Sequence, residues 1–343
     1  MRKPSRLGAL LAIAALVLAG CQTAARKPAT FAEAVRQRDA VTIVVTDSGL
    51  GGLSVAADLA AKLPASGISQ SARIVFVNAL LDDAIGYNDL KLEKDKLRVF
   101  DAALSAMESR YRPDLILIAC NTLSVLYDKT EHAKAHGTEM VSIVGMGADL
   151  IDRKLKENPG GTAVIFGTKT TIESGAYPRL LVEKGVPADR IVGEPCPRLV
   201  GSIERGADSE ETAAYIQTFV KEALRKLPAS SGPLVASLNC THFGYAMDLW
   251  KKTFAGLGYP GVTILDPNPL MADLVLREGG PKHYPATAVT VEVVSKVKIG
   301  ADVQASLGKL LRAVSPLTAD ALTNYKYDPD LFRVTIDPSN VIR

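Results

Sequence analysis

The sequence has 343 residues, of which 47% are hydrophobic and 22% are charged, an ordinary composition for a globular protein and a length sufficient for two domains. The formal net charge is +3, but Arg2, Lys3 and Arg6 lie before residue 20 in a segment without acidic residues. The remainder is formally neutral, which argues against nucleic acid as the main partner.

The first twenty residues resemble a bacterial lipoprotein signal peptide. Their basic start is followed by an apolar run at 7–18, which is too short to be a comfortable membrane span. The run ends in LAGC at 18–21, which is similar to a lipobox, where the cysteine is acylated after cleavage. This resemblance predicts a signal peptide over 1–20, a lipid on Cys21, and a tether with a short helical lead-in over 21–40. Gln22 rather than Asp follows the cysteine, which favours the outer membrane, facing the periplasm. The alternative is an apolar helix with a chance cysteine.

From residue 41 the chain alternates short β-branched runs with amphipathic stretches. This alternation predicts an α/β fold with parallel sheets and helices on both faces, because apolar runs without alternation are typical of strands buried on both sides. Ligands in such folds sit beyond the carboxyl ends of the strands. The expected strands are 41–46, 73–77, 114–119, 140–144, 162–166, 234–238, 262–265 and an edge strand within 289–298. The expected helices are 53–63, 91–110, 123–135, 172–184 and 210–227.

Three of these strand ends carry reactive or flexible residues. A cysteine at the end of a buried strand lies near helix-terminal N–H groups, which stabilise a thiolate. Two of the three ends repeat the same pattern of apolar strand, Cys, small polar residues and helix. This weak internal repeat predicts two similar domains that each present one thiol. The three sequences are DSGLGG at 47–52, CNT at 120–122 and NCTH at 239–242.

Apart from Cys21, three cysteines remain, and an odd number leaves at least one free thiol. Free thiols in an exported chain suggest a use, although either Cys120 or Cys240 alone could be a small core residue. The pair could form a disulfide, bind zinc with His242, or include the nucleophile of a Cys-His hydrolase. The two thiols could also act as acid and base on opposite faces of one carbon, since the ordinary cysteine pKa of about 8.5 is near working pH.

Five motifs in order over about residues 41–280 are similar to those of the glutamate racemase family. They are DSGLGGLS at 47–54, ACNT at 119–122, FGTKTTIESGAY at 166–177, CPRLVGSIE at 196–204 and CTH at 240–242. His242 occupies a position where aspartate racemases usually carry Glu, which favours the glutamate branch. The resemblance implies a cofactor-independent racemase that interconverts L- and D-glutamate or a related acidic amino acid. It also implies two similar doubly wound domains, 41–143 plus 265–343 and 144–264, with the active site in the cleft between them.

The resemblance further implies a role for each matching residue. Cys120 and Cys240 would be the paired acid/base thiols, with Asp47 assisting the first. His242, paired with Glu204, would assist the second. A helix N-cap for Asp47 and a solvated helix face for Glu204 are the local alternatives, and Cys196 is expected in the core. No cofactor and no metal are expected. The implied substrate-binding residues are Ser48, Tyr87, Asn88, Asn121, Thr122, Thr171 and Thr241.

The sequence also departs from the family. The Pro-Tyr-Gly segment of the substrate pocket is GYND at 86–89, which leaves the far end of the substrate open. Cytoplasmic members of the family feed cell-wall synthesis, so an exported member predicts another amino acid or another purpose. The glycine-rich loop at 49–52 lacks the G-x-G-x-x-G spacing of dinucleotide loops and is expected to receive a substrate carboxylate.

Two further functions remain open. One is an exported amino-acid-binding lipoprotein on the same fold without catalysis, and the other is a related isomerase or decarboxylase. A binding protein has no need of two matched thiols, and the presence of both argues against a one-cysteine decarboxylase. The expected partners are a small-molecule amino acid and, through the lipid on Cys21, a membrane. Nucleic acid is not expected, and a homodimer remains open.

Overall fold

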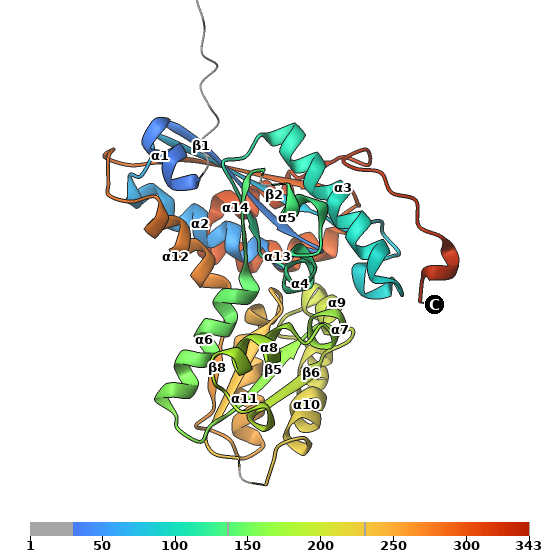
Figure 1. Ribbon diagram of the computed structural model, residues 1–343. Coiled ribbons are helices and arrows are strands. Elements are labelled where there is room, and N and C mark those ends of the chain that lie inside the picture. The colour runs from blue at the N-terminus through green and yellow to red at the C-terminus, as the bar shows by residue number, and fades with distance from the viewer. Residues whose placement is uncertain (1–29, 136, 230, 343) are drawn as a thin grey trace, which may run out of the picture.

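The computed structural model describes residues 30–135, 137–229 and 231–342, which form two α/β domains (Figure 1). The first sheet has six strands in the order β10-β9-β2-β1-β3-β4, and the second has four in the order β6-β5-β7-β8. All pairings between these strands are parallel, which confirms the predicted fold class. The strands are β1 Ala40–Asp47, β2 Ser71–Asn78, β3 Leu115–Ile118, β4 Glu139–Ser142, β5 Thr162–Gly167, β6 Ile191–Pro195, β7 Leu234–Asn239, β8 Thr263–Leu265, β9 Ala288–Ser295 and β10 Lys326–Tyr327.

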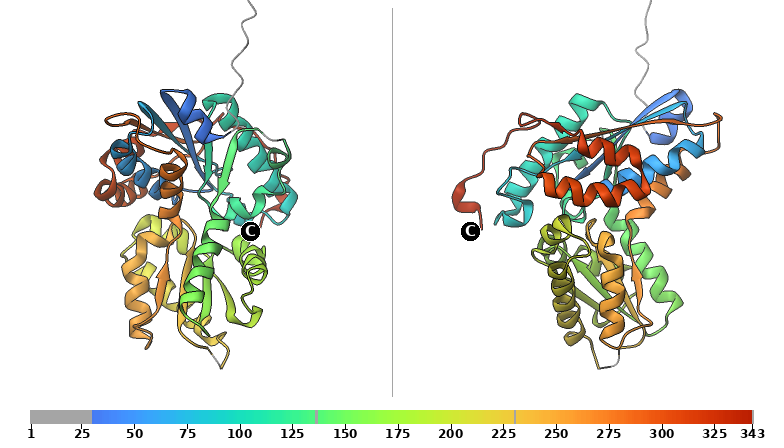
Figure 2. Two further views of the ribbon diagram at one scale, coloured as in Figure 1. Left: turned by 60° about the vertical axis from the view of Figure 1, so that its left-hand side comes forward. Right: turned by 180° about the vertical axis from the view of Figure 1, so that it is seen from behind.

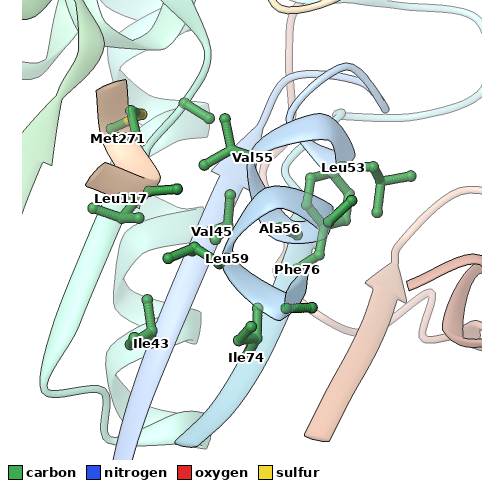
Figure 3. Close-up of a cluster of buried hydrophobic side chains, with 14 of the residues drawn as sticks. Ile43, Val45, Leu53, Val55, Ala56, Leu59, Ile74, Phe76, Leu117 and Met271 are labelled. Carbon is green, nitrogen blue, oxygen red and sulfur yellow. The ribbon is translucent and has the colours of Figure 1, made fainter. Parts of the chain in front are cut away.

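Helices cover both faces of the first sheet because successive side chains of its central strand point to opposite sides. Ile43 and Val45 pack in the cluster that Figure 3 shows, against α2 (Leu53–Ser66). Val44 packs on the other face, against the cluster that includes α3 (Glu93–Tyr111). Both faces of the strand are therefore apolar, as the uninterrupted run of the sequence predicts.

The second sheet follows the same rule. Phe166 faces a cluster with Trp250, at a ring-centroid distance of 4.7 Å, whereas Ile165 faces the opposite cluster. The remaining helices are α1 Phe31–Gln37, α4 Asn121–Tyr127, α5 Glu131–Lys134, α6 Ile143–Glu157, α7 Lys169–Glu173, α8 Ala176–Glu183, α9 Leu199–Arg205, α10 Glu210–Arg225, α11 Met247–Gly256, α12 Asn268–Glu278, α13 Ala301–Val314 and α14 Pro316–Thr323. Short 3₁₀ helices occupy Tyr87–Asp89 (η1), Ala188–Arg190 (η2), Phe243–Ala246 (η3) and Pro338–Asn340 (η4).

Several expected elements are wrong in extent. The strand expected at 140–144 ends at Ser142, and Ile143 begins α6, because a short apolar run fits a buried strand and a buried helix equally well. The helix expected at 123–135 divides into α4 and α5, where the side chain of Thr130 accepts a hydrogen bond from Ala133 N and starts a new helix. The helix expected at 172–184 divides at Gly175, whose φ of +64° is left-handed. The strand β6 was not expected.

The C-terminal residues return to the first domain. β9 pairs with β2 in parallel, and β10 adds only two residues beyond it, so β9 is not the outermost strand that its alternating pattern predicts. Helices α13 and α14, red in Figure 2, pack against α2. The signal peptide and Cys21 lie outside the described residues. Within the part that the structure describes, no helix has both the length and the apolar character needed to cross a bilayer.

Candidate active site

A cavity of about 220 Å³ takes its walls from residues at the carboxyl ends of β1, β3 and β7. Every predicted catalytic and substrate-binding residue lines this cavity except Thr171. The strand ends of both domains therefore meet at one site, as parallel sheets with facing carboxyl ends require.

The first half of the site centres on Cys120, which follows β3 and stands as the N-cap residue of α4. Its Sγ lies 3.1 Å from Ser48 Oγ. Burial raises the pKa of Cys120 far above its usual range, and the neighbouring Asp47 raises it further, while the hydrogen bond of Ser48 opposes the rise. Asp47 is also buried, and burial raises the pKa of its carboxyl. Cys120 is thus held as a thiol beside a buried carboxyl group.

The second half centres on Cys240, which follows β7, with His242 Nδ1 at 3.9 Å from its Sγ. His242 Nε2 lies 2.8 Å from Oε1 of Glu204, which belongs to α9. Burial lowers the pKa of His242, but the hydrogen bonds of Cys240 and Glu204 outweigh burial and raise it well above 6.5. An imidazolium beside a sulfur atom supplies the charge partner that a thiolate needs. The two cysteines therefore lie in electrostatically different surroundings.

A direct hydrogen bond joins the two halves. Thr241 Oγ1 donates to Asp47 Oδ2 at 2.8 Å. The glycine-rich loop makes this approach possible, because a Cβ on Gly51 would overlap Thr241 Oγ1 and would lie 2.5 Å from His242 Nδ1. Asn268, at the start of α12, donates from Nδ2 to the carbonyl oxygen of Thr241 at 3.0 Å. The loop at 49–52 therefore has a packing role in the contact between domains, which its spacing alone did not indicate.

Thr171 lies one side chain behind the cavity wall. Its Oγ1 is 3.0 Å from Thr168 Oγ1, which is in turn 2.7 Å from Thr122 Oγ1. Thr168 lines the cavity in its place and was not among the predicted site residues. The signal that could have found Thr168 is its position as the N-cap of α7, where its side chain accepts from Thr171 N.

The segment at 86–89 forms the remaining wall. Tyr87 is buried, and burial raises the pKa of its hydroxyl well above 10. Asn88 Oδ1 accepts a hydrogen bond from Thr170 N at 3.0 Å, across the two domains. Asp89 Oδ2 accepts a hydrogen bond from Gly86 N at 2.8 Å, which stabilises the start of the short helix η1. Leu80, Asp89 and Val200 also line the cavity and were not predicted.

The cysteines of the described residues, Cys120, Cys196 and Cys240, are free, so the disulfide alternative is not what this structure shows. Cys196 packs in the core cluster of the second domain, where it was expected. Among the described residues, no group of three or more His, Cys, Asp or Glu side chains is arranged to hold a metal ion.

No protein-family model matches the chain. The sequence is 30% identical over 228 residues to a glutamate racemase of Sulfurihydrogenibium sp. (strain YO3AOP1), which covers 77% of that protein and 65% of this chain. The chain belongs to the glutamate racemase family. A glutamate racemase of Paracoccus denitrificans (strain Pd 1222) is a second relative, 28% identical over 244 residues, with 83% of that protein and 68% of this chain covered. The chain is accordingly an amino-acid racemase.

Solved structures of the family share the fold. The glutamate racemase of Francisella tularensis subsp. tularensis SCHU S4, in complex with D-glutamate, has a TM-score of 0.61 at 20% identity, covering 81% of this chain and 95% of that one. Glutamate racemase isoform RacE1 of Bacillus anthracis has a TM-score of 0.60 at 22% identity, covering 79% and 94%. At these identities the likeness establishes the two-domain α/β architecture.

Proposed function

We propose that the chain interconverts L- and D-glutamate without a cofactor, with Cys120 and Cys240 as the acid and base on opposite faces of Cα. One observation carries the proposal. Two cysteines from matching strand ends of two different domains line the same cavity, and each has its own polar partner. The names of the relatives support glutamate as the amino acid.

The proposed reaction moves one proton in each half. A thiolate on one cysteine takes the Cα proton from one face, which leaves a carbanion, and the thiol of the other cysteine gives a proton to the opposite face. One thiol and one thiolate exchange roles, so no atom is gained or lost. His242, whose pKa is raised by its hydrogen bonds with Cys240 and Glu204, lies beside Cys240, whereas Asp47 lies beside Cys120, so each sulfur has its own polar partner. Inversion then follows from the placement of one sulfur in each domain.

Hydroxyl groups in the cavity wall can bind the carboxylates of an amino acid. Ser48, Thr122 and Thr168 place hydroxyl groups in the wall, and these can donate to carboxylate oxygens. Asp47 is a buried carboxylate that can attract the substrate ammonium. Burial raises the pKa of Asp47 although the charge of His242 opposes the rise, so a bound ammonium would further favour the ionised carboxylate.

A binding protein without catalysis is the second candidate, and the environment of Cys240 argues against it. Ligand binding alone has no use for a buried His242 that joins a thiol to Glu204. Buried charged pairs cost desolvation energy, so one placed against a thiol at a cavity wall is typical of acid–base chemistry.

The test is Cα hydrogen exchange with D- and L-glutamate in heavy water, followed by NMR and combined with polarimetry. Cys120→Ser and Cys240→Ser should each lower racemisation by about 10²–10⁴-fold, because a serine hydroxyl is too weak an acid near neutral pH. Cys196→Ser is the matched control, since Cys196 is equally buried but does not line the cavity. Racemisation at the wild-type rate by either cavity variant would exclude the two-thiol mechanism, and an absence of exchange by the wild type would exclude racemisation of glutamate.

We also propose that the chain is a lipoprotein of the cell envelope, anchored through Cys21 in the outer membrane and facing the periplasm. The support is the basic start, the apolar run at 7–18 and the LAGC sequence. Mass spectrometry of the native membrane fraction should find Cys21 as a lipid-modified N-terminus, and Cys21→Ser should be released from the membrane. An intact Met1, or a normally anchored variant, would exclude the anchor.

A further inference from the structure

Tyr177 belongs to the second domain but reaches the cysteine motif of the first. It is the second residue of α8, is 1% exposed, and does not line the cavity. Its hydroxyl donates to Oδ1 of Asn121 at 2.6 Å. Asn121 directly follows Cys120 and lines the cavity. A buried hydrogen bond thus runs from behind the cavity wall to a residue of the site.

The other side of the same hydroxyl faces the second cysteine motif. A Cβ placed on Gly147 would lie 2.6 Å from the Tyr177 hydroxyl oxygen and 3.2 Å from Nδ2 of Asn239, the residue before Cys240. Gly147 belongs to α6, and its lack of a side chain leaves room for both groups. Burial raises the pKa of the Tyr177 hydroxyl above its usual range, and the neighbouring Asn239 opposes the rise. The Asn239 amide makes no hydrogen bond among the described residues, so the bond to Asn121 is the one that orients the Tyr177 hydroxyl.

The direction of this proton decides which way the Asn121 amide lies. An asparagine carries an acceptor oxygen and a donor NH₂ group on opposite corners of one plane. Because Oδ1 is bound to Tyr177, Nδ2 is turned away from it, and Nδ2 is buried without a hydrogen-bond partner among the described residues. Asn121 is 2% exposed, so its unpaired N–H groups are costly unless a molecule in the cavity accepts from them.

We propose that Tyr177 is a positioning residue that holds the Asn121 amide with its Nδ2 as the donor to a carboxylate oxygen of the amino-acid substrate. This inference rests on the proposed function and deepens it. Without the hydroxyl, the amide can rotate by half a turn and present its oxygen, which repels a carboxylate. Tyr177 then acts on the substrate only through Asn121.

A double-mutant cycle on kcat/KM for Cα exchange with glutamate tests this dependence. Tyr177→Phe should lower kcat/KM roughly tenfold, the size expected for one hydrogen bond to a charged group. Asn121→Ala should lower it at least as much. Because Tyr177 acts through Asn121, the double variant should be no worse than Asn121→Ala alone. Tyr111→Phe is the control, since it also removes a buried hydroxyl, one that has no hydrogen-bond partner among the described residues and lies outside the cavity.

Asn121→Asp adds a variant that keeps the partner of Tyr177. It retains the acceptor oxygen for the hydroxyl but replaces the donor by a second oxygen, so the affinity of the folded variant for glutamate, measured by calorimetry, should fall. The positioning role would be overturned if the loss of kcat/KM in the double variant equalled the product of the two single losses. Wild-type glutamate affinity in Asn121→Asp would also overturn it. A Tyr177→Phe protein equal to the Tyr111→Phe protein would do the same. If the wild type exchanges no Cα hydrogen of glutamate, the proposed function fails, and the inference with it.

Discussion

Glu204→Gln removes the charge that keeps His242 protonated while it preserves the shape of the side chain. Glu204 Oε1 lies 2.8 Å from His242 Nε2, and this carboxylate is among the groups that raise the pKa of His242 against the effect of burial. A hydrogen bond with a charged partner contributes about 1.5–3 kcal/mol, which corresponds to about 10- to 150-fold in rate. The Glu204 side chain is 21% exposed, so water weakens its interaction with His242. The lower end of that range, about tenfold, is therefore expected.

The assay is the pH profile of kcat/KM for racemisation in both directions. In Glu204→Gln the pKa of His242 falls, so the alkaline limb of the profile should move to lower pH. Because the two enantiomers have equal free energies, kcat/KM must fall equally in both directions. The raised pKa of His242 contributes stability that is present below its unfolded pKa of about 6.5 and is lost as pH rises through its folded pKa. The variant should therefore be destabilised more at pH 6 than at pH 9.

Glu211→Gln is the matched control for this experiment. Glu211 pairs with Arg205, the residue after Glu204, at 2.9 Å, but the pair is solvent-exposed and Glu211 does not line the cavity. Exposed pairs contribute little, so this variant should behave as the wild type. A wild-type rate and alkaline limb in Glu204→Gln, or an equal loss of activity in the two variants, would show that Glu204 does not act through the charge of His242.

Three other substitutions test separate parts of the site. Gly51→Ala forces a methyl group against His242 and should lower the free energy of unfolding by about 1–3 kcal/mol, with loss of racemisation, measured by denaturation and exchange. Asp47→Asn should abolish activity yet raise the melting temperature at pH 7. Because the pKa of Asp47 is raised, its ionised form lowers the free energy of unfolding at any pH above the ordinary Asp pKa, and this gain in the variant should vanish as pH falls below about 4. Asn88→Gly removes the hydrogen bond to Thr170 and should cost about 0.5–1.5 kcal/mol, with a raised KM for glutamate.

Each of these three substitutions has a result that would contradict its expected effect, and Gly51→Ala also has a control variant. Gly145→Ala, in α6 where a Cβ would meet no atom within 4 Å, should be neutral or slightly stabilising, and an equal loss at Gly145 and Gly51 would contradict the steric argument. A stability gain in Asp47→Asn that is the same at pH 3 and pH 7 would contradict the electrostatic one. An unchanged KM in Asn88→Gly would show that the contact between domains does not shape the cavity.

The local sequence pattern was sufficient to predict the elements whose residues can be buried in only one way. Residues 41–46 and 234–238 are mainly apolar runs without polar alternation, and they form β1 and β7, because such runs are typical of strands buried between two layers of helices. The motifs at 47, 120 and 240 were recognisable because each follows such a strand. Pattern failed where a cap or a glycine divided a helix, as at Thr130 and Gly175, since those breaks depend on single side chains.

Local pattern did not decide which of these residues meet: the family resemblance implied one shared cleft, and the tertiary structure decided which side chains line it. Cys120 and Cys240 lie 120 positions apart in the sequence, and nothing in either local pattern requires that they share a cavity. The same holds for Thr171, which the family motif places at the substrate and the structure places behind Thr168. Tyr177 has an ordinary helical sequence around it, and only the packing of α8 beside the first domain gives its hydroxyl a target. Sequence patterns report the burial of a residue along its own element, whereas contacts between domains depend on how those elements pack.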